Sequence, residues 1–196
     1  TDGNKNNHIG VPFSMLNMEN RYKSSVIEIG TSQVGEIRGL TNLVKPNIAA
    51  ITNVSSGHLE GLKDTDSIAS EKGDILKFHI PDGIAVLPRD SNFFNYWSNI
   101  TNAKKIVSFG FHENSDFKVM SPIIDVKHNL TSFQLIHDGL KEECLINGVG
   151  THNTLNAALG LAISSLLGLK ISEVKEALRD VDFPERRLSI HKSIAN

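Results

Sequence analysis

The sequence predicts an α/β protein with a mostly parallel sheet flanked by helices, joined to a small antiparallel β subdomain. Three observations support this fold class. Short apolar runs bounded by turn-forming residues alternate with helical segments as far as residue 109. Polar and apolar residues then interleave between residues 116 and 147. Helical periodicity returns at residue 151 and continues towards the end of the chain.

Composition limits the class of protein. The 196 residues are enough for one large domain, or one domain with a small appendage. A formal net charge of −2 argues against a general nucleic-acid binder. The single cysteine, Cys144, leaves no intramolecular disulfide framework and suits a reducing compartment. No apolar run approaches the ~20 residues of a membrane span, so we expect a cytoplasmic protein without membrane insertion. The chain opens on Thr1 without a methionine, which we interpret as a fragment.

The first half of the chain alternates helices with short apolar strands. After a loop over residues 1–10, the pattern predicts helices at 11–18, 34–43, 64–79 and 92–100. Between them it predicts buried strands at 24–30, 45–52, 83–88 and 105–109. The helix at 64–79 has Asp64 or Thr65 as its cap, and Glu28 interrupts the first strand.

The second half begins with an antiparallel sheet over residues 116–147. Asn129 and the Asp138-Gly139 pair mark its turns. A long helix then starts at Thr151 and ends before Gly168. A last helix is expected to be capped by Ser172, with its apolar residues on a buried side.

Three candidate site residues lie near predicted strand ends or on the helix that follows. Glu28, in an apolar strand, is suited to Mg²⁺ or to pairing with a lysine or arginine. His58 follows small residues that let a ligand approach, although a loop histidine is more often only solvated, and Glu60 beside it is a lesser candidate. For Lys72, a solvated face with Glu71 and Asp74 is the simplest interpretation.

Polar residues elsewhere form weaker candidates. Asn153 and Asn156 are expected on one side of the helix, away from its apolar stripe. There they either cap the helix or form hydrogen bonds with the edge of a purine base. Asn6 and Asn7 lie in an amide-rich loop, which usually only forms turns. Arg186-Arg187 either bind phosphate or lie on the surface. The chain contains no Gly-x-x-x-x-Gly-Lys-Ser/Thr phosphate loop.

Taken together, these motifs resemble the central, ATP-binding domain of the Mur ligases, which build the peptide stem of bacterial peptidoglycan. The resemblance covers essentially the whole chain in order. It rests on Thr1-Asp-Gly-Asn-Lys-Asn-Asn-His-Ile-Gly-Val-Pro12, Val26-Ile-Glu-Ile-Gly30, Gly35-Glu-Ile37, Ser56-Gly-His-Leu-Glu-Gly61, Lys72-Gly-Asp-Ile75, Gly150-Thr-His-Asn-Thr-Leu-Asn156 and Phe183-Pro-Glu-Arg-Arg-Leu188. Within the family, the opening signature and the His-Leu-Glu form are most similar to the branch that adds D-Ala-D-Ala.

The resemblance implies a role for each candidate. Glu28 and His58 would bind Mg²⁺, and Lys72 would be the lysine that CO₂ carbamylates in this family. The remaining roles concern the substrates: Asn153, Asn156 and Arg187 (or, in a less favoured register, Arg186) would contact ATP, and Asn6 and Asn7 would hold the UDP-muramoyl peptide. Residues 1–183 would then be the central domain without its phosphate-loop segment, with 116–147 as the small antiparallel sheet, and 184–196 a junction to a further domain.

The implied function is that of an ATP-dependent ligase. This chain would be a fragment of the ligase and would be inactive by itself. It would join D-Ala-D-Ala to UDP-N-acetylmuramoyl-tripeptide through an acyl phosphate, using ATP and Mg²⁺, as a monomer. Two alternatives stay open. One is a sister ligase that adds lysine or diaminopimelate, or a cyanophycin- or folylpolyglutamate-type relative. The other is a non-catalytic nucleotide- or protein-binding module. Thr31-Ser32 and Asp2 depart from the family's usual residues, which leaves the substrate preference less fixed.

Overall fold

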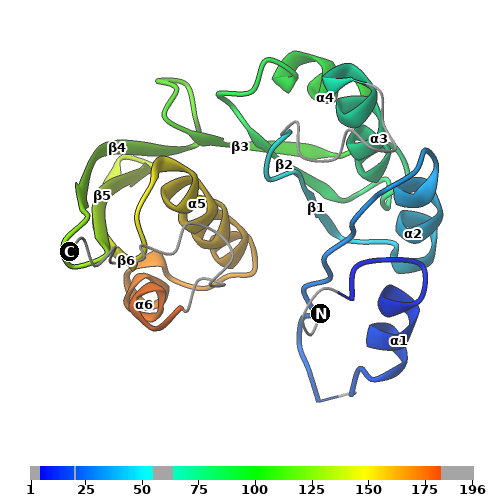
Figure 1. Cartoon of the computed structure of the whole chain (residues 1–196), viewed down its shortest axis with the longest axis horizontal. Helices are drawn as coiled ribbons and strands as arrows, with labels where there is room; N and C mark the ends of the chain where they lie inside the picture. The colour runs from blue at the N-terminus through cyan, green and yellow to red at the C-terminus, as the bar shows by residue number, and fades with distance from the viewer. Residues whose placement is uncertain (1–4, 20, 55–63, 182–196) are drawn as a thin grey trace, which may run out of the picture. The chain divides into compact units, whose positions relative to one another are not determined.

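The computed structural model describes residues 5–19, 21–54 and 64–181, and the chain divides into two compact units, 1–107 and 108–196 (Figure 1). Its strands are hydrogen-bonded in the order β1-β2-β3-β4-β5-β6. They are β1 (Ile48–Ala50), β2 (Ile84–Pro88), β3 (Lys105–Gly110), β4 (Phe117–Asp125), β5 (Leu130–His137) and β6 (Leu140–Asn147). The β1–β2 and β3–β4 pairs are parallel, whereas β4–β5 and β5–β6 are antiparallel. This mixed sheet with flanking helices confirms the predicted fold class.

The helices lie close to their predicted positions. They are α1 (Gly10–Leu16), α2 (Glu36–Val44), α3 (Thr65–Lys77), α4 (Phe94–Ile100), α5 (Thr151–Leu166), α6 (Ile171–Ala177) and the 3₁₀ turn η2 (Leu178–Asp180). Among the described helices, none has both the length and the apolar character needed to cross a bilayer.

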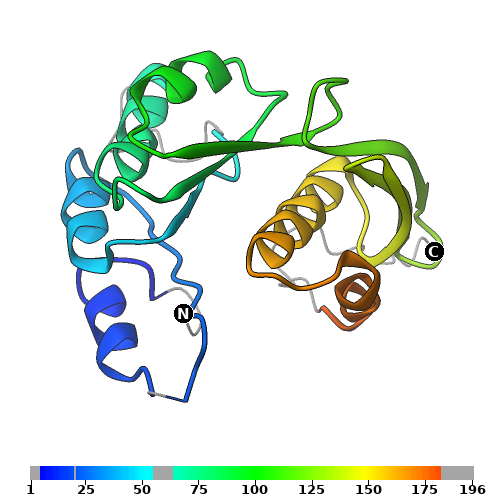
Figure 2. The ribbon, with the colours of Figure 1, turned by 180° about the vertical axis from the view of Figure 1, so that it is seen from behind.

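In the first unit, helices α3 and α4 pack against the parallel strands β1 and β2 (Figures 1 and 2). The shared core consists of Ala49, Ile51, Ala69, Leu76, Ala85, Leu87 and Trp97. The indole nitrogen of Trp97 donates to the Ala69 carbonyl over 2.9 Å, so this large side chain is buried without an unpaired donor. At the start of α3, the Asp64 carboxylate accepts from the Ser67 amide over 2.7 Å, which confirms Asp64 as the cap.

The second unit has two tight turns and a long helix. Asn129 has a φ of +55°, and Asp138 and Gly139 have φ of +50° and +76°, so both predicted turns are present. Helix α5 ends in a Schellman motif, in which the Leu169 and Gly168 amides donate to the carbonyls of Ser164 and Ser165. Gly168 adopts a φ of +85° there, which explains the glycine.

Two predicted elements are wrong. Residues 24–30 form no strand, and Val26 is 73% exposed, so the described residues do not cover this apolar run as a buried strand requires. Ser172 does not cap α6. The cap is Lys170, whose carbonyl accepts from the amides of Glu173 and Val174, and α6 buries none of its residues. Helix α6 therefore starts just after the Gly168 turn, two residues earlier than a cap at Ser172 allows.

Candidate functional site

Lys72 lies on α3 in a half-buried position. Its ammonium nitrogen donates to the Asn53 carbonyl, just beyond β1, over 2.5 Å. Burial lowers the pKa of Lys72 below its ordinary value of 10.5, because the charged form loses hydration. The simplest interpretation of the sequence, a solvated face shared with Glu71 and Asp74, is wrong: Asp74 pairs with Lys77 over 3.0 Å, and Glu71 is buried.

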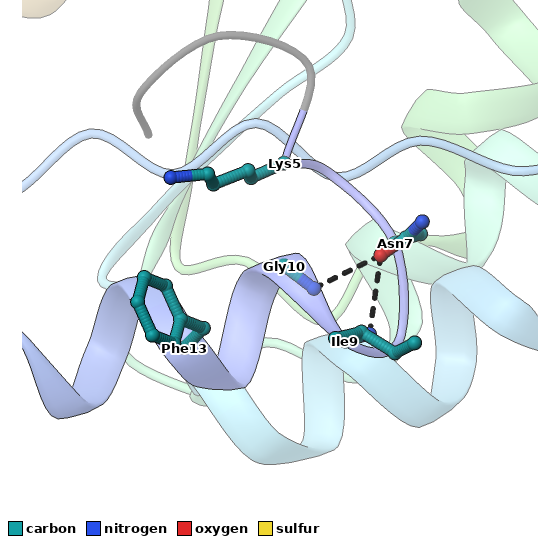
Figure 3. A pocket seen from close by; sticks show the side chains of 5 residues that line it. All are labelled: Lys5, Asn7, Ile9, Gly10 and Phe13. Carbon is teal, nitrogen blue, oxygen red and sulfur yellow. Dashed lines mark hydrogen bonds between the residues drawn. The ribbon is translucent and has the colours of Figure 1, made fainter.

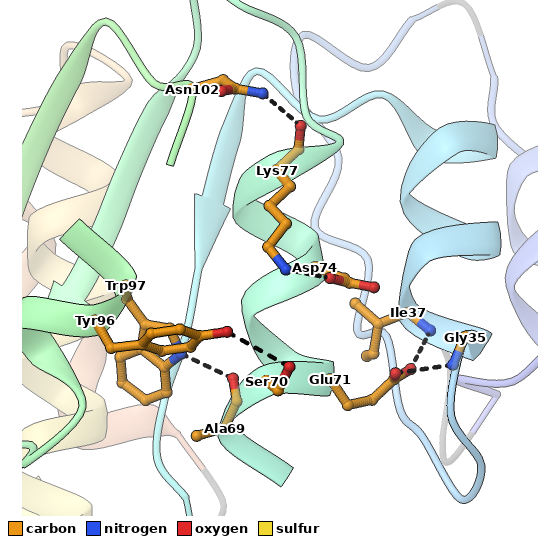
Figure 4. Close-up of polar contacts among 10 residues, drawn as sticks. All are labelled: Gly35, Ile37, Ala69, Ser70, Glu71, Asp74, Lys77, Tyr96, Trp97 and Asn102. Carbon is orange, nitrogen blue, oxygen red and sulfur yellow. Dashed lines mark hydrogen bonds and ion pairs between the residues drawn. The ribbon is translucent and has the colours of Figure 1, made fainter. Parts of the chain in front are cut away.

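Glu71 supports the helix that carries Lys72, and the sequence does not predict this role. Its side chain is only 4% exposed, and it holds the beginning of the neighbouring helix α2. One carboxylate oxygen accepts from the Gly35 amide over 2.8 Å and the other from the Ile37 amide over 2.9 Å (Figure 4). These amides belong to the positive end of the α2 dipole, where a carboxylate is stabilising. Glu71 thus ties α2 to the helix that carries Lys72.

The loop before α2 has a second carboxylate. Oε2 of Glu36 accepts from the amides of Ser32 and Gln33 over 2.6 and 3.0 Å, and from the Ser32 hydroxyl over 3.2 Å. The Ser32 amide is the largest reason why the pKa of Glu36 lies below its ordinary value of 4.5. The loop that follows Glu28 and Gly30 is therefore fixed by carboxylates rather than by a strand ladder.

Glu28 is exposed and accepts a hydrogen bond from a side-chain amide. The Asn6 side-chain nitrogen donates to Glu28 Oε1 over 3.0 Å. The Asn6 carbonyl also accepts from the Gly30 amide over 2.8 Å. An exposed carboxylate is an oxygen ligand of the kind that Mg²⁺ prefers, so the residue type fits the predicted metal role. Asn6, which the family resemblance predicts as a substrate contact, directs its amide nitrogen to Glu28.

Asn7 forms the start of α1 and lines a small pocket. Its side-chain oxygen accepts from the amides of Ile9 and Gly10 over 3.1 and 2.9 Å (Figure 3). The hollow holds about 280 Å³ and is lined by Lys5, Asn7, Ile9, Gly10 and Phe13. The Lys5 ammonium lies 5.2 Å from the centre of the Phe13 ring. Asn7 thus has a capping role, and its amide nitrogen remains available for the predicted substrate contact.

Asn153 and Asn156 differ in burial, although their spacing gives them similar directions around α5. Asn153 is only 4% exposed and its amide nitrogen donates to the Val149 carbonyl over 2.9 Å, whereas Asn156 is exposed. The prediction that both lie away from the buried side is wrong for Asn153, because the loop before the helix packs against its first turn, where the Thr131 hydroxyl also donates to the Gly148 carbonyl over 2.7 Å. Of the pair, Asn156 presents its amide to solvent.

Four predicted site residues lie outside the described part of the chain: His58, Glu60, Arg186 and Arg187. Within residues 5–19, 21–54 and 64–181, no group of three or more His, Cys, Asp and Glu side chains is arranged to hold a metal ion. The described candidates of the first unit nonetheless lie on connected segments. Glu28 accepts a hydrogen bond from Asn6. Glu71 accepts one from the loop before α2 and lies beside Lys72 on α3.

Comparison with known proteins places these features in context. Residues 1–164 match the family described as the Mur ligase middle domain. The chain is 32% identical over 189 residues to the UDP-N-acetylmuramoyl-tripeptide–D-alanyl-D-alanine ligase of Escherichia coli, covering 96% of this chain and 41% of the relative. The chain therefore spans about two fifths of that relative's length.

Solved structures give the same result. A crystal structure of MurF from Acinetobacter baumannii superposes with a TM-score of 0.90 at 26% identity, covering 99% of this chain and 42% of that one. A MurF ligase from Thermotoga maritima, solved in complex with ADP, superposes with a TM-score of 0.80 at 25% identity, covering 98% of this chain and 44% of that one.

Proposed function

The chain belongs to the Mur ligase family, and from this we propose that it forms the middle part of an ATP-dependent ligase that joins D-Ala-D-Ala to UDP-N-acetylmuramoyl-tripeptide. The observation that carries the proposal is the 32% identity to the Escherichia coli D-alanyl-D-alanine ligase over 96% of this chain. The ADP in the Thermotoga maritima relative supports nucleotide binding. The match covers both units, because it runs over 189 residues.

In the proposed reaction, the terminal carboxylate of the tripeptide takes the γ-phosphoryl group of ATP and becomes an acyl phosphate. The amine of D-Ala-D-Ala then attacks the acyl carbon, and phosphate leaves through a tetrahedral intermediate. Negative charge gathers between nucleotide and carboxylate, so positioning and charge stabilisation are the main tasks of the protein. Mg²⁺ would supply the positive charge that offsets it.

The residues of this chain divide these tasks. Glu28 and His58 would hold the metal, and Asn156 would contact the nucleotide. Asn153 donates to the Val149 carbonyl and would shape the loop before α5. Its predicted contact with ATP rests on the family resemblance alone. Arg187 would approach the phosphates, and Asn7 the UDP-muramoyl peptide.

Lys72 would act as a carbamate. The amine nitrogen attacks CO₂ and loses a proton, which converts a cation into a carboxylate-like anion. Only the neutral amine can attack, so the burial that lowers the pKa of Lys72 favours this modification. The short contact with the Asn53 carbonyl directs the nitrogen towards the chain that follows β1.

The test uses the full-length protein that contains this chain. Ligation of D-Ala-D-Ala to UDP-N-acetylmuramoyl-tripeptide should consume ATP, and Lys72→Ala should lower kcat by about 10²-fold or more, on the scale of lost charge stabilisation in active sites. Lys77→Ala is the matched control on the same helix, since Lys77 only pairs with Asp74, and it should keep the wild-type rate. ¹³C-labelled CO₂ should give a carbamate signal that Lys72→Ala loses.

The same assay addresses the alternatives. Turnover with free lysine or diaminopimelate and none with D-Ala-D-Ala would favour a sister ligase. The absence of ATP consumption with any amine would favour a non-catalytic binding module. A cytoplasmic location and a monomeric state stay predictions.

A further inference from the structure

Asn6 binds the segment that carries Glu28 at two points. Its side-chain nitrogen donates to Glu28 Oε1 over 3.0 Å, and its backbone carbonyl accepts from the Gly30 amide over 2.8 Å. One bond fixes the direction of the carboxylate and the other fixes the backbone two residues further on. Both come from one residue of the N-terminal loop, 22 positions earlier in the sequence.

Gly30 is a glycine because Asn6 lies against it. A Cβ atom at position 30 would lie 2.8 Å from Asn6 Cγ and 2.9 Å from each terminal atom of that amide. Gly30 is not among the glycines with positive φ, so backbone conformation does not explain it. A side chain at this position would push the amide away from Glu28.

The neighbouring residue has a different role. The Asn7 side chain accepts from the Ile9 and Gly10 amides and so begins α1. The two consecutive asparagines therefore face different partners, and only Asn6 reaches the candidate metal ligand.

We propose that Asn6 is a positioning residue for Glu28: it orients the carboxylate for the metal rather than contacting the UDP-muramoyl peptide. This inference rests on the proposed function. An amide donor suits the role, because it directs a carboxylate oxygen without supplying the counter-charge that a lysine or arginine brings. A glutamate has several rotatable bonds, and holding it in one orientation before the ion arrives removes part of the ordering cost of binding.

The test is metal affinity in the full-length protein. Mn²⁺ binding is measured by electron paramagnetic resonance with a non-hydrolysable ATP analogue present, and the KM for UDP-N-acetylmuramoyl-tripeptide is measured in parallel. Asn6→Ala should weaken Mn²⁺ binding about 10-fold, the lower end of the effect of losing a residue that orients a metal ligand. The KM should change by less than about twofold, as expected if no peptide contact is lost. A raised KM with unchanged Mn²⁺ binding would overturn the inference.

Gly30→Ala tests the same contact from the other side. It should weaken Mn²⁺ binding as Asn6→Ala does, and the double variant should be no worse than Asn6→Ala alone, since the amide that the new methyl group displaces is gone. Additive losses would contradict the inference. Asn17→Ala is the control: its amide donates only within α1, to the Phe13 carbonyl, and Mn²⁺ binding should stay at the wild-type level.

Failure of this inference is distinct from failure of the proposed function. Wild-type protein that does not ligate refutes the function. Wild-type protein that ligates, with Mn²⁺ binding lowered by Glu28→Gln but not by Asn6→Ala, refutes only the role of Asn6. Mn²⁺ binding unchanged by Glu28→Gln also overturns it, because the carboxylate would then have no metal to be positioned for.

Discussion

The two units hold their polar loops in different ways. In the first unit, side chains far away in the sequence do so: Glu71 accepts from Gly35 across 36 positions, and Asn6 donates to Glu28 across 22. In the second unit, Thr131 donates to Gly148 across 17 positions, and the loops before β4 and α5 also have nearer partners. Asp116 accepts from the Ser108 amide across 8 positions, and Asn153 donates to Val149 across 4.

This difference bears on function, because the candidate metal ligand Glu28 and the candidate catalytic residue Lys72 lie in the first unit. Loops that carry chemistry are typically placed by a scaffold rather than by their own sequence. A substitution at a distant partner in the first unit should therefore disturb a loop beside the site. In the second unit, a substitution at Asp116 or Asn153 should disturb mainly the loop next to the substituted residue.

The largest effect is expected at Glu71. Glu71→Ala removes the acceptor of the half-buried Gly35 amide and of the buried Ile37 amide at the start of α2, and hydrogen bonds to a charged group contribute about 1.5–3 kcal/mol each. We expect the free energy of unfolding of the chain to fall by about 3 kcal/mol in urea denaturation. The amides of Gly35 and Ile37 should also exchange faster with solvent.

The matched control for Glu71 is Glu173→Ala on α6. Glu173 is exposed and forms a surface pair with Lys170 over 3.5 Å, so the loss should stay below about 1 kcal/mol. If both variants lost the same free energy, the distinction between the two units would have no energetic basis.

The asparagine pair on α5 gives the second prediction. Asn153→Ala leaves the Val149 carbonyl without its donor inside the unit, and the free energy of unfolding should fall by about 2 kcal/mol. Asn156→Ala removes an exposed amide, so stability should change by less than about 0.5 kcal/mol while nucleotide affinity falls. Urea denaturation and titration with an ATP analogue in the full-length protein separate the two effects. Equal stability losses would contradict the different burial of the two residues.

Local signals explain what the sequence could predict. The Asp64 cap and the turn at Asp138-Gly139 depend on residues within a few positions, and both are present. The 24–30 segment was misread because an apolar run favours extended backbone but does not supply a partner, and Val26 is 73% exposed. Asn153 was misplaced because helical periodicity gives relative angles, not the side that the preceding loop covers.

The types of residue in the candidate site could be predicted, but the contacts that hold those residues in place could not. Glu28 is indicated by its place in an apolar run and Lys72 only by its family motif, whereas Glu71 beside Lys72 has the pattern of an ordinary surface acid. Its partners, Gly35 and Ile37, are more than thirty positions away. No local pattern encodes such a contact, since it exists only once α2 and α3 have packed.

The smallest effect concerns pH. The amide donors of its loop lower the pKa of Glu36 from 4.5 in the folded chain, so between that value and the folded pKa the unfolded chain binds more protons. The stabilisation is therefore complete above about pH 4.5 and is lost as pH falls through the folded pKa. The difference between wild type and Glu36→Gln should be below about 1 kcal/mol, because water screens this carboxylate, and it should shrink only on the acid side in urea denaturation at stepped pH.

Lys175 of the second unit provides the opposite case. Its ammonium donates to Glu142 over 2.8 Å, and this bond raises the pKa of Lys175 above 10.5. The stabilisation is then complete below about pH 10.5 and is lost as pH rises through the folded pKa. Lys175→Met should therefore converge with the wild type as pH rises into alkali, and Glu36→Gln should converge as pH falls into acid. A stability difference that stayed unchanged in alkali for Lys175→Met, or in acid for Glu36→Gln, would show that the contact does not hold its charged group in the folded chain.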